Sequence, residues 1–240
     1  MSVLPAGGFA EYAVLPAQFT FRAPASLDDA EAAALTIAYQ TGWFALHRRT
    51  RLMPGETVLV HAAAGGVGTA AIQLAKAAGA RVIGVVGGPE KAGVAAAMGA
   101  DVVIDRRSED IVARVKAETG GRGVDVVYDP VGGASFTAST KCIAFEGRIL
   151  VIGFASGDIP SAALNHALVK NYSIIGLHWG LYRQMEPGAL HECHTELERL
   201  VAAGTIRPWV SARYGLDQVV DALEDLAGGT TTGRVAYIAG

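Results

Sequence analysis

Several features that specialised proteins need are scarce in this sequence. Only two of its 240 residues are cysteine, Cys142 and Cys193, which is too few for a disulfide framework or a four-cysteine zinc site. An excess of positive or negative charge is missing too, because the 20 Lys and Arg nearly balance the 23 Asp and Glu and leave a net charge of -3. We therefore expect a cytoplasmic protein whose partners are small molecules, with no nucleic-acid partner.

Long apolar runs are also missing. No stretch approaches the roughly 20 uncharged apolar residues of a membrane span, and no basic segment followed by an apolar run begins the chain. Secretion and a membrane partner are therefore not expected. The sequence does contain 51% hydrophobic residues, which suffices for the core of an ordinary globular protein.

From residue 56 onward, short β-branched apolar runs alternate with helix-like segments. This alternation is typical of a parallel sheet covered by helices on both faces. The predicted fold class is therefore α/β, a doubly wound parallel six-stranded sheet. The expected strands are 57–61, 81–86, 101–105, 124–128, 148–152 and 172–177.

Helix signals fill the segments between and around these strands. Pro89 in a first turn and Gly99 just past the last turn bound one helix. Ahead of the first strand, Ser26 with Asp29 three residues on resembles a capping box for a helical stretch that reaches Leu46. The other expected elements are helices at 69–78, 89–98, 108–118, 190–203 and 216–226, and a final strand at 233–238.

The segment 58–71 runs from a strand through a glycine-rich turn into a helix. Gly65 and Gly66 would let the backbone approach a pyrophosphate, and Gly68 would let helix and strand pack closely. Ala63 replaces the first glycine of the usual dinucleotide fingerprint, so a tight turn in another kind of α/β protein is the alternative. The order of strand, loop, helix and strand favours a Rossmann dinucleotide site.

The end of the second strand bears on which dinucleotide binds. An NAD site usually has Asp or Glu there for the ribose 2'-hydroxyl, but this chain has Val86 and Gly87. Lys91 could reach a 2'-phosphate instead, and Arg106 and Arg107 end the third strand on the same side of the sheet. We therefore predict NADP(H). The alternative is that these three cations are solvated surface charges, with Lys91 neutralised by its neighbour Glu90.

These features resemble those of a known family, the zinc-independent quinone oxidoreductases of the medium-chain dehydrogenase/reductase superfamily. This family is also described as zeta-crystallin-like. The most specific match is the loop His61-Ala62-Ala63-Ala64-Gly65-Gly66-Val67-Gly68. Supporting motifs lie at 7–12, 39–42, 99–101, 127–132 and 232–235.

The resemblance implies contacts with the pyrophosphate, the 2'-phosphate, the ribose and the nicotinamide of NADP(H). Arg106 departs from the aromatic residue that is frequent in the family at its position. The implied contacts are Thr41, Gly65, Gly66, Val67, Gly87, Lys91, Arg106, Pro130, Val131, Gly153, Phe154 and Ala155.

The same resemblance implies a function and an assembly. It implies hydride transfer from NADPH to a quinone or another electron-poor acceptor without metal, and a homodimer through strand 172–177. An enoyl or alkenal reductase of the same superfamily and a non-catalytic NADPH-binding protein are the alternatives. The catalytic residue stays unknown.

The resemblance also divides the chain. Family members begin with a GroES-like domain, and only its late strand, at 7–14, is expected in this chain. The implied parts are a remnant of the GroES-like β domain at 1–24, an NADP-binding Rossmann domain at 25–207, and a return to the GroES-like domain at 208–240.

A cluster of two histidines and a cysteine, and three single residues elsewhere, could also have a chemical role. His191 and His194 lie three residues apart with Cys193 between them, but the zinc-protease pattern needs two His four apart and no third ligand is evident. We therefore expect no metal there and take these as surface helix residues. Tyr39, Tyr128 and Asp129 could donate protons, although structural roles are favoured for all three.

Overall fold

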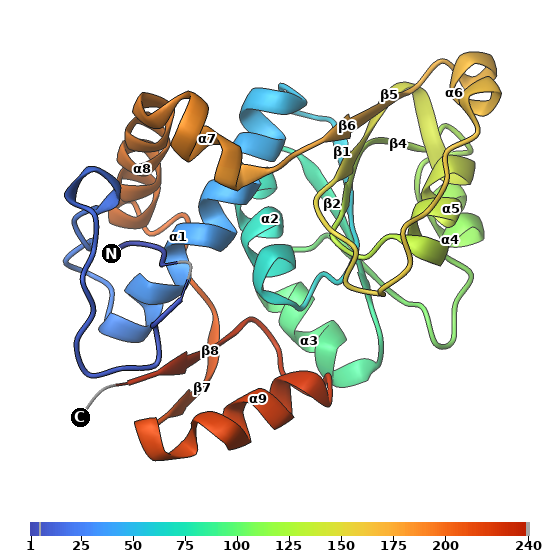
Figure 1. The fold of residues 1–240 in the computed structure, drawn as a ribbon. Helices are drawn as coiled ribbons and strands as arrows, with labels where there is room; N and C mark the ends of the chain where they lie inside the picture. Colours follow the sequence, from blue (N-terminus) through green and yellow to red (C-terminus); the bar gives the residue numbers. More distant parts are fainter. Residues whose placement is uncertain (5, 239–240) are drawn as a thin grey trace.

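The computed structural model describes residues 1–4 and 6–238. Its main sheet is parallel throughout, with the strand order β3-β2-β1-β4-β5-β6 (Figure 1). Order reverses between β1 and β4, where a doubly wound sheet opens the crevice that holds its ligand. The strands are β1 (Thr57–Val60), β2 (Arg81–Val86), β3 (Val102–Asp105), β4 (Val124–Asp129), β5 (Ile143–Val151) and β6 (Ser173–Gly176). The predicted six-stranded α/β fold is confirmed.

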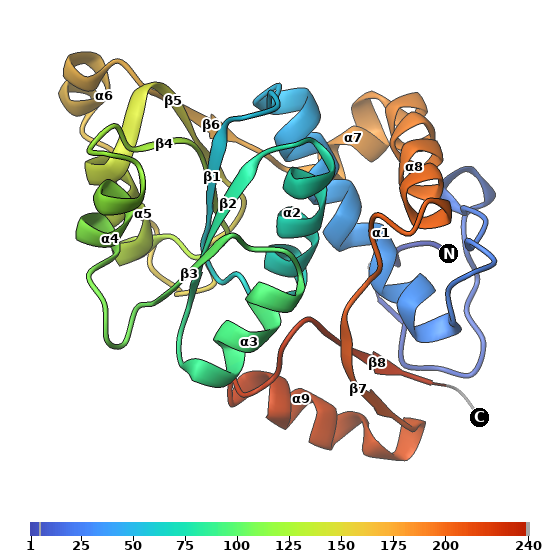
Figure 2. The same cartoon turned by 180° about the vertical axis from the view of Figure 1, so that it is seen from behind.

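Helices cover both faces of this sheet (Figures 1 and 2). On one face Leu35 and Leu74 belong to a large core, and on the other Val115 and Phe136 belong to a second core, all four of them buried. The first face carries α1 (Asp29–Trp43), α2 (Gly66–Ala77) and α3 (Pro89–Ala97), with α7 (Trp179–Met185) and α8 (Pro187–Ala202) packed beyond α1. The second face carries α4 (Ile111–Glu118) and α5 (Gly133–Cys142), and α6 (Leu164–Lys170) precedes β6.

A smaller two-stranded sheet closes the chain. Strands β7 (Val210–Tyr214) and β8 (Arg234–Tyr237) pair in parallel, and α9 (Val219–Ala227) connects them. The Gly233 N–H donates to the carbonyl oxygen of Ala64 at 2.7 Å, in the glycine-rich loop of the main sheet. The carboxyl-terminal segment is therefore joined to the loop that was predicted to hold the dinucleotide.

The predicted start of α1 is wrong. The N-cap is Asp28, whose carboxylate accepts the Glu31 N–H at 2.9 Å, while Glu31 accepts the Asp28 N–H at 3.1 Å. Glu31 also accepts from Arg207 Nε at 2.6 Å, a contact across 176 residues that local pattern cannot show. The α-helix ends at Trp43, and a π-helical turn over Phe44–Arg49 continues it past the predicted end.

Other boundaries and elements also differ from the predictions. Helix α2 begins at Gly66, three residues before the predicted start, and β5 begins at Ile143 rather than at residue 148. Helices α5, α6 and α7 and strand β7 were not predicted. Helix α5 is rich in Ser and Thr, which favour turns over helix interiors, so its helical signal in the sequence is weak.

The expected strand at 7–14 is wrong as well. These residues form neither helix nor strand, and their side chains are exposed, with Tyr12 at 91% and Val14 at 93%. A strand needs a neighbour to hydrogen-bond with, and no strand in the described part of the chain pairs with this segment.

Within residues 1–4 and 6–238, no helix combines the length and apolar character needed to cross a membrane.

Candidate cofactor site

The turn between β1 and α2 is shaped by backbone contacts that leave no room for side chains. Ala62 takes the left-handed conformation, with φ of 48°. A Cβ on Gly68 would lie 2.2 Å from the Ala62 carbonyl oxygen, and one on Gly66 would lie 2.5 Å from Nε of Arg234. Glycine at 66 and 68 therefore lets helix, loop and guanidinium approach closely.

Positive charge converges on this turn. The first turn of a helix has backbone N–H groups without intrahelical acceptors, and α2 has its amino terminus at Gly66. The Arg234 side chain is half-buried beside it and has no hydrogen-bond acceptor among the described residues. Burial lowers the pKa of Arg234. An anion beside Gly66 would compensate this charge. Arg234 lies in the family motif at 232–235 but was not among the predicted cofactor residues.

A pocket of about 500 Å³ extends from this turn along the carboxyl ends of the strands. The loops after β1, β2, β3 and β4 line it, and Gly229 and Thr231 of the carboxyl-terminal segment contribute to one wall. Of the twelve predicted cofactor residues, the pocket brings together Gly65, Gly87, Lys91, Arg106, Val131 and Ala155.

The other six predicted residues do not line this pocket. Thr41 is buried in α1, and Pro130 is buried just after β4. Gly66 and Val67 form the first turn of α2, beside the pocket wall at Gly65. Gly153 is half-buried and Phe154 is exposed at 40%, in the loop that reaches the pocket at Ala155.

One end of the pocket carries three cations, Lys91, Arg106 and Arg107. None of the described residues that line the pocket is Asp or Glu. Glu90 makes no ion pair with Lys91 in the described structure; the Lys91 Nζ donates instead to the Gly229 carbonyl oxygen at 2.5 Å. The neutralisation of Lys91 by Glu90, which was the alternative to a phosphate contact, is therefore absent from the described structure, and Lys91 lines the pocket.

A nearby carboxylate does not cancel this charge inside the pocket. Asp105 accepts the backbone N–H of Gly88 at 2.9 Å and that of Arg107 at 3.0 Å. These backbone bonds, the Arg107 one foremost, lower the pKa of Asp105. The positive charges of Arg107 and Arg106 also lower this pKa, so Asp105 fixes the strand end and offsets part of their charge. It makes no ion pair with either arginine side chain in the described structure.

The floor of the pocket contains a buried histidine. Ser139 donates its hydroxyl proton to the Ser135 carbonyl oxygen at 2.8 Å, so His61 Nε2 must donate to Ser139 Oγ, also at 2.8 Å. His61 Nδ1 is then an acceptor without a partner among the described residues, as is the buried hydroxyl of Tyr128. Burial lowers the pKa of His61, which favours the neutral ring. Unpaired polar atoms at this depth indicate that a polar ligand or water completes the site.

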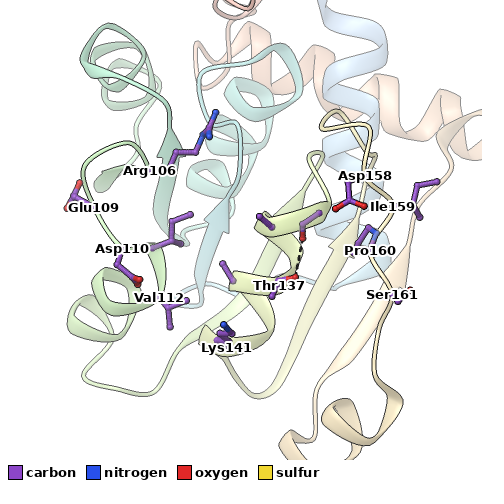
Figure 3. Close-up of a pocket in the computed structure, with 14 residues that line it drawn as sticks. Arg106, Glu109, Asp110, Val112, Thr137, Lys141, Asp158, Ile159, Pro160 and Ser161 are labelled. Atoms are coloured by element: carbon purple, nitrogen blue, oxygen red, sulfur yellow. Dashed lines mark hydrogen bonds between the residues drawn. The ribbon is translucent and has the colours of Figure 1, made fainter.

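A larger pocket of about 790 Å³ adjoins the first and shares Arg106 and Ala134 with it. Figure 3 shows α5 along its floor, with Asp158 on one rim and Glu109 and Asp110 on the other. It contains no part of the glycine loop and carries acidic groups, which would repel phosphates. The smaller pocket is therefore the better dinucleotide site despite its size.

Two of the three candidate proton donors, Tyr39 and Asp129, have structural contacts, whereas the Tyr128 hydroxyl has no partner among the described residues. Tyr39 donates to the Arg207 carbonyl oxygen at 3.0 Å, and burial raises the pKa of Tyr39. Asp129 accepts the backbone N–H groups of Val131 and Gly132 at 2.9 and 3.0 Å. These bonds account for both residues without a catalytic role.

Of the three residues on α8 that were expected at the surface, His191 is exposed, whereas Cys193 and His194 are buried. Cys193 is fully buried and His194 is 5% exposed. Nε2 of His194 lies 3.0 Å from the Arg22 carbonyl oxygen, and Nε2 of His191 lies 3.1 Å from that of Gln18. These contacts attach the amino-terminal segment to α8. In the described part of the chain, no three His, Cys, Asp or Glu residues group as a metal site would require.

Comparison with known proteins agrees with this geometry. A family model described as zinc-binding dehydrogenase matches residues 66–195. The quinone oxidoreductase-like protein 2 homolog of Nematostella vectensis is 41% identical over 231 residues, which cover 95% of this chain and 63% of that protein. The chain thus spans less than two thirds of this relative's length.

Solved structures match over nearly the whole chain. A quinone oxidoreductase of Escherichia coli, complexed with NADPH, is 36% identical with a TM-score of 0.84, over 92% of this chain and 69% of that one. A mycobacterial protein, also complexed with NADPH, is 31% identical with a TM-score of 0.90, over 97% and 71%. The chain therefore belongs to the zinc-binding dehydrogenase family of medium-chain dehydrogenases/reductases, among its quinone oxidoreductase-like members.

Proposed function

We propose that the protein is an NADPH-dependent oxidoreductase that reduces a quinone or another electron-poor acceptor. The observation that carries this proposal is the pocket beside the glycine loop. Lys91, Arg106 and Arg107 line it, and none of its described lining residues is Asp or Glu. Bound NADPH would supply a hydride. The two NADPH-bound relatives support the same cofactor.

The proposed cofactor contacts, from residues that line the pocket and from residues beside it, divide into three groups. The N–H groups of Gly65, Gly66 and Val67, together with the Arg234 guanidinium, hold the pyrophosphate. Lys91 and Arg106 bind the 2'-phosphate, and Gly87 leaves room for it. The remaining contacts, along the ribose and nicotinamide, are Thr41, Pro130, Val131, Gly153, Phe154 and Ala155.

The test separates an enzyme from a protein that only binds the cofactor. NADPH is titrated by fluorescence, and its oxidation is then followed by absorbance with quinones, enones and alkenals as acceptors. Oxidation that depends on a quinone supports the proposal, and preference for enones or alkenals indicates the alternative reductase. Tight NADPH binding without oxidation by any acceptor would leave only the binding function.

The proposal needs no metal. The family's description includes zinc, but the described residues offer no group of three ligands, so no step depends on a metal ion. We expect a chelator to leave folding and NADPH binding unchanged. Stoichiometric zinc in the purified protein would contradict this.

Because Cys142 and Cys193 are unpaired and buried, we also propose a reducing, cytoplasmic location.

A homodimer through β6 is part of the proposal. This strand is the last in the sheet, so one row of its backbone groups has no neighbouring strand. Pairing of two copies across a two-fold axis would satisfy them. Ile174→Lys should shift sedimentation toward monomers, whereas Val220→Lys, on exposed α9, should not. A wild-type monomer at micromolar concentration would contradict this assembly.

A further inference from the structure

A third pocket, of about 300 Å³, lies at the amino ends of the parallel strands, where β4 and β5 begin. Four cations line it, from α4, the loop before β4, α5 and α6: Lys116, Arg122, Lys141 and Lys170. None of the described residues around it is Asp or Glu. Its lining therefore has one sign of charge only.

Helix geometry explains each lysine singly. Lys116, Lys141 and Lys170 occupy the last turns of three different helices, where carbonyl groups attract cations. Lys170 Nζ donates to the Thr140 carbonyl oxygen at 2.8 Å, which fixes it at the end of α5. The end of a helix does not explain why three such lysines converge on one cavity.

The cations of this cavity differ in burial and in their partners: Lys116 and Lys141 are exposed, Lys170 is half-buried, and Lys141 also lines the larger pocket that carries Asp158. Only Arg122 has an acidic partner, Asp125; the three lysines make no ion pair within the described residues. Burial first, and then repulsion from Lys116, lowers the pKa of Lys170. By contrast, Lys76 in the last turn of α2 binds both oxygens of Asp101 at 2.8 and 2.9 Å.

We propose that this pocket binds a phosphate group, held by the ammonium groups of Lys116, Lys141 and Lys170. A multivalent oxyanion accepts several charge-assisted hydrogen bonds at once and relieves the repulsion among these cations. The ring of Phe145, 71% exposed, lies on the same lining and offers an apolar surface to an organic group on that phosphate. The site is separate from the cofactor pocket, which lies at the carboxyl ends of the strands.

Titration calorimetry with pyrophosphate, at physiological ionic strength and with and without saturating NADPH, tests the proposal. We expect saturable binding to one site in the presence of NADPH. Lys116→Gln and Lys170→Gln should each weaken it about tenfold, the effect of one charge-assisted hydrogen bond. Lys76→Gln is the matched control, because Lys76 also ends a helix but has an acidic partner, and it should change nothing.

Two further ligands separate the possible sources of the phosphate. Tighter binding of phenyl phosphate than of inorganic phosphate, lost in Phe145→Ala, would indicate a phosphorylated metabolite; equal binding would indicate the free anion. Absence of saturable binding overturns the proposal, as does equal weakening by Lys76→Gln. Displacement of pyrophosphate by NADPH would place the anion in the cofactor pocket and also overturn it. Because the lysine variants report on this cavity alone, failure of the proposed enzyme activity would not affect the result.

Discussion

The two ends of the cofactor pocket are built in different ways. The glycine-loop end is formed by closely packed main chain: Gly68 lies against the Ala62 carbonyl oxygen, and Gly66 leaves room for the Arg234 guanidinium. The other end is formed by the side chains of Lys91, Arg106 and Arg107, on residues that are half-buried or exposed. Substitution at the first end should therefore damage the fold as well as binding. Substitution at the second should change only which cofactor binds.

Gly68→Ala tests the first half of this comparison and should have the largest effect. The new Cβ would lie 2.2 Å from a backbone oxygen that cannot rotate away. Overpacking a core typically costs about 1 to 3 kcal/mol, so we expect about 3 kcal/mol or more here, with loss of measurable NADPH binding. Urea denaturation and fluorescence titration measure the two effects.

Gly93→Ala in α3 is the matched control, because a Cβ there meets nothing within 4 Å. Alanine in a helix is favoured over glycine by up to about 1 kcal/mol, so this variant should be as stable as the wild type or more so. If Gly68→Ala were equally stable and bound NADPH normally, the backbone account of the glycine-loop end would be wrong.

Arg106→Ala and Lys91→Ala test the second end. Each removes one charge-assisted hydrogen bond to a 2'-phosphate, which is worth about 1.5 to 3 kcal/mol, or roughly ten- to a hundredfold in affinity. NADPH should bind more weakly by that factor, while NADH affinity and the free energy of unfolding should stay unchanged. Arg199→Ala is the control for loss of one positive charge, because the Arg199 side chain is exposed on α8 and paired with Glu196. Equal weakening of NADH binding would show that these cations do not contact the 2'-phosphate.

The same comparison explains what the sequence could predict. β-Branched runs mark the six strands of the main sheet, and the glycine loop is recognisable because its backbone contacts demand glycine at fixed spacing. Lys91 is different, since its bond to Gly229 spans 138 residues and depends on how the carboxyl-terminal segment folds back. The contact between Arg234 and Gly66 could not be predicted for the same reason, because only the packing of β8 brings Arg234 to Gly66.

The capping box of α1 and the region before it show another limit of local pattern. Ser26 and Asp28 are both good N-caps, and the choice between them rests on Glu31, which Arg207 holds from a distant segment. The motif at 7–12 led us to expect a strand over 7–14, but a strand forms only when a neighbour pairs with it. In both cases the deciding contact is tertiary.

The smallest expected effect concerns His61, a buried polar side chain at the glycine-loop end. Burial lowers its pKa in the folded protein, whereas in the unfolded chain it takes up a proton near the ordinary value of about 6.5. The unfolded state therefore binds more protons as the pH falls below about 6.5, and this contribution to stability, complete above that pH, is progressively lost. One proton changes the free energy of unfolding by at most about 1.4 kcal/mol per pH unit.

His61→Gln keeps a donor for Ser139 but cannot titrate, so its unfolding free energy should fall less steeply than that of the wild type between about pH 7 and pH 5. His178→Gln, at an exposed position before α7, should retain the wild-type slope. If denaturation curves give the same slope for His61→Gln and the wild type, then His61 is not held neutral by burial, and the glycine-loop end is less closed to water than its packing indicates.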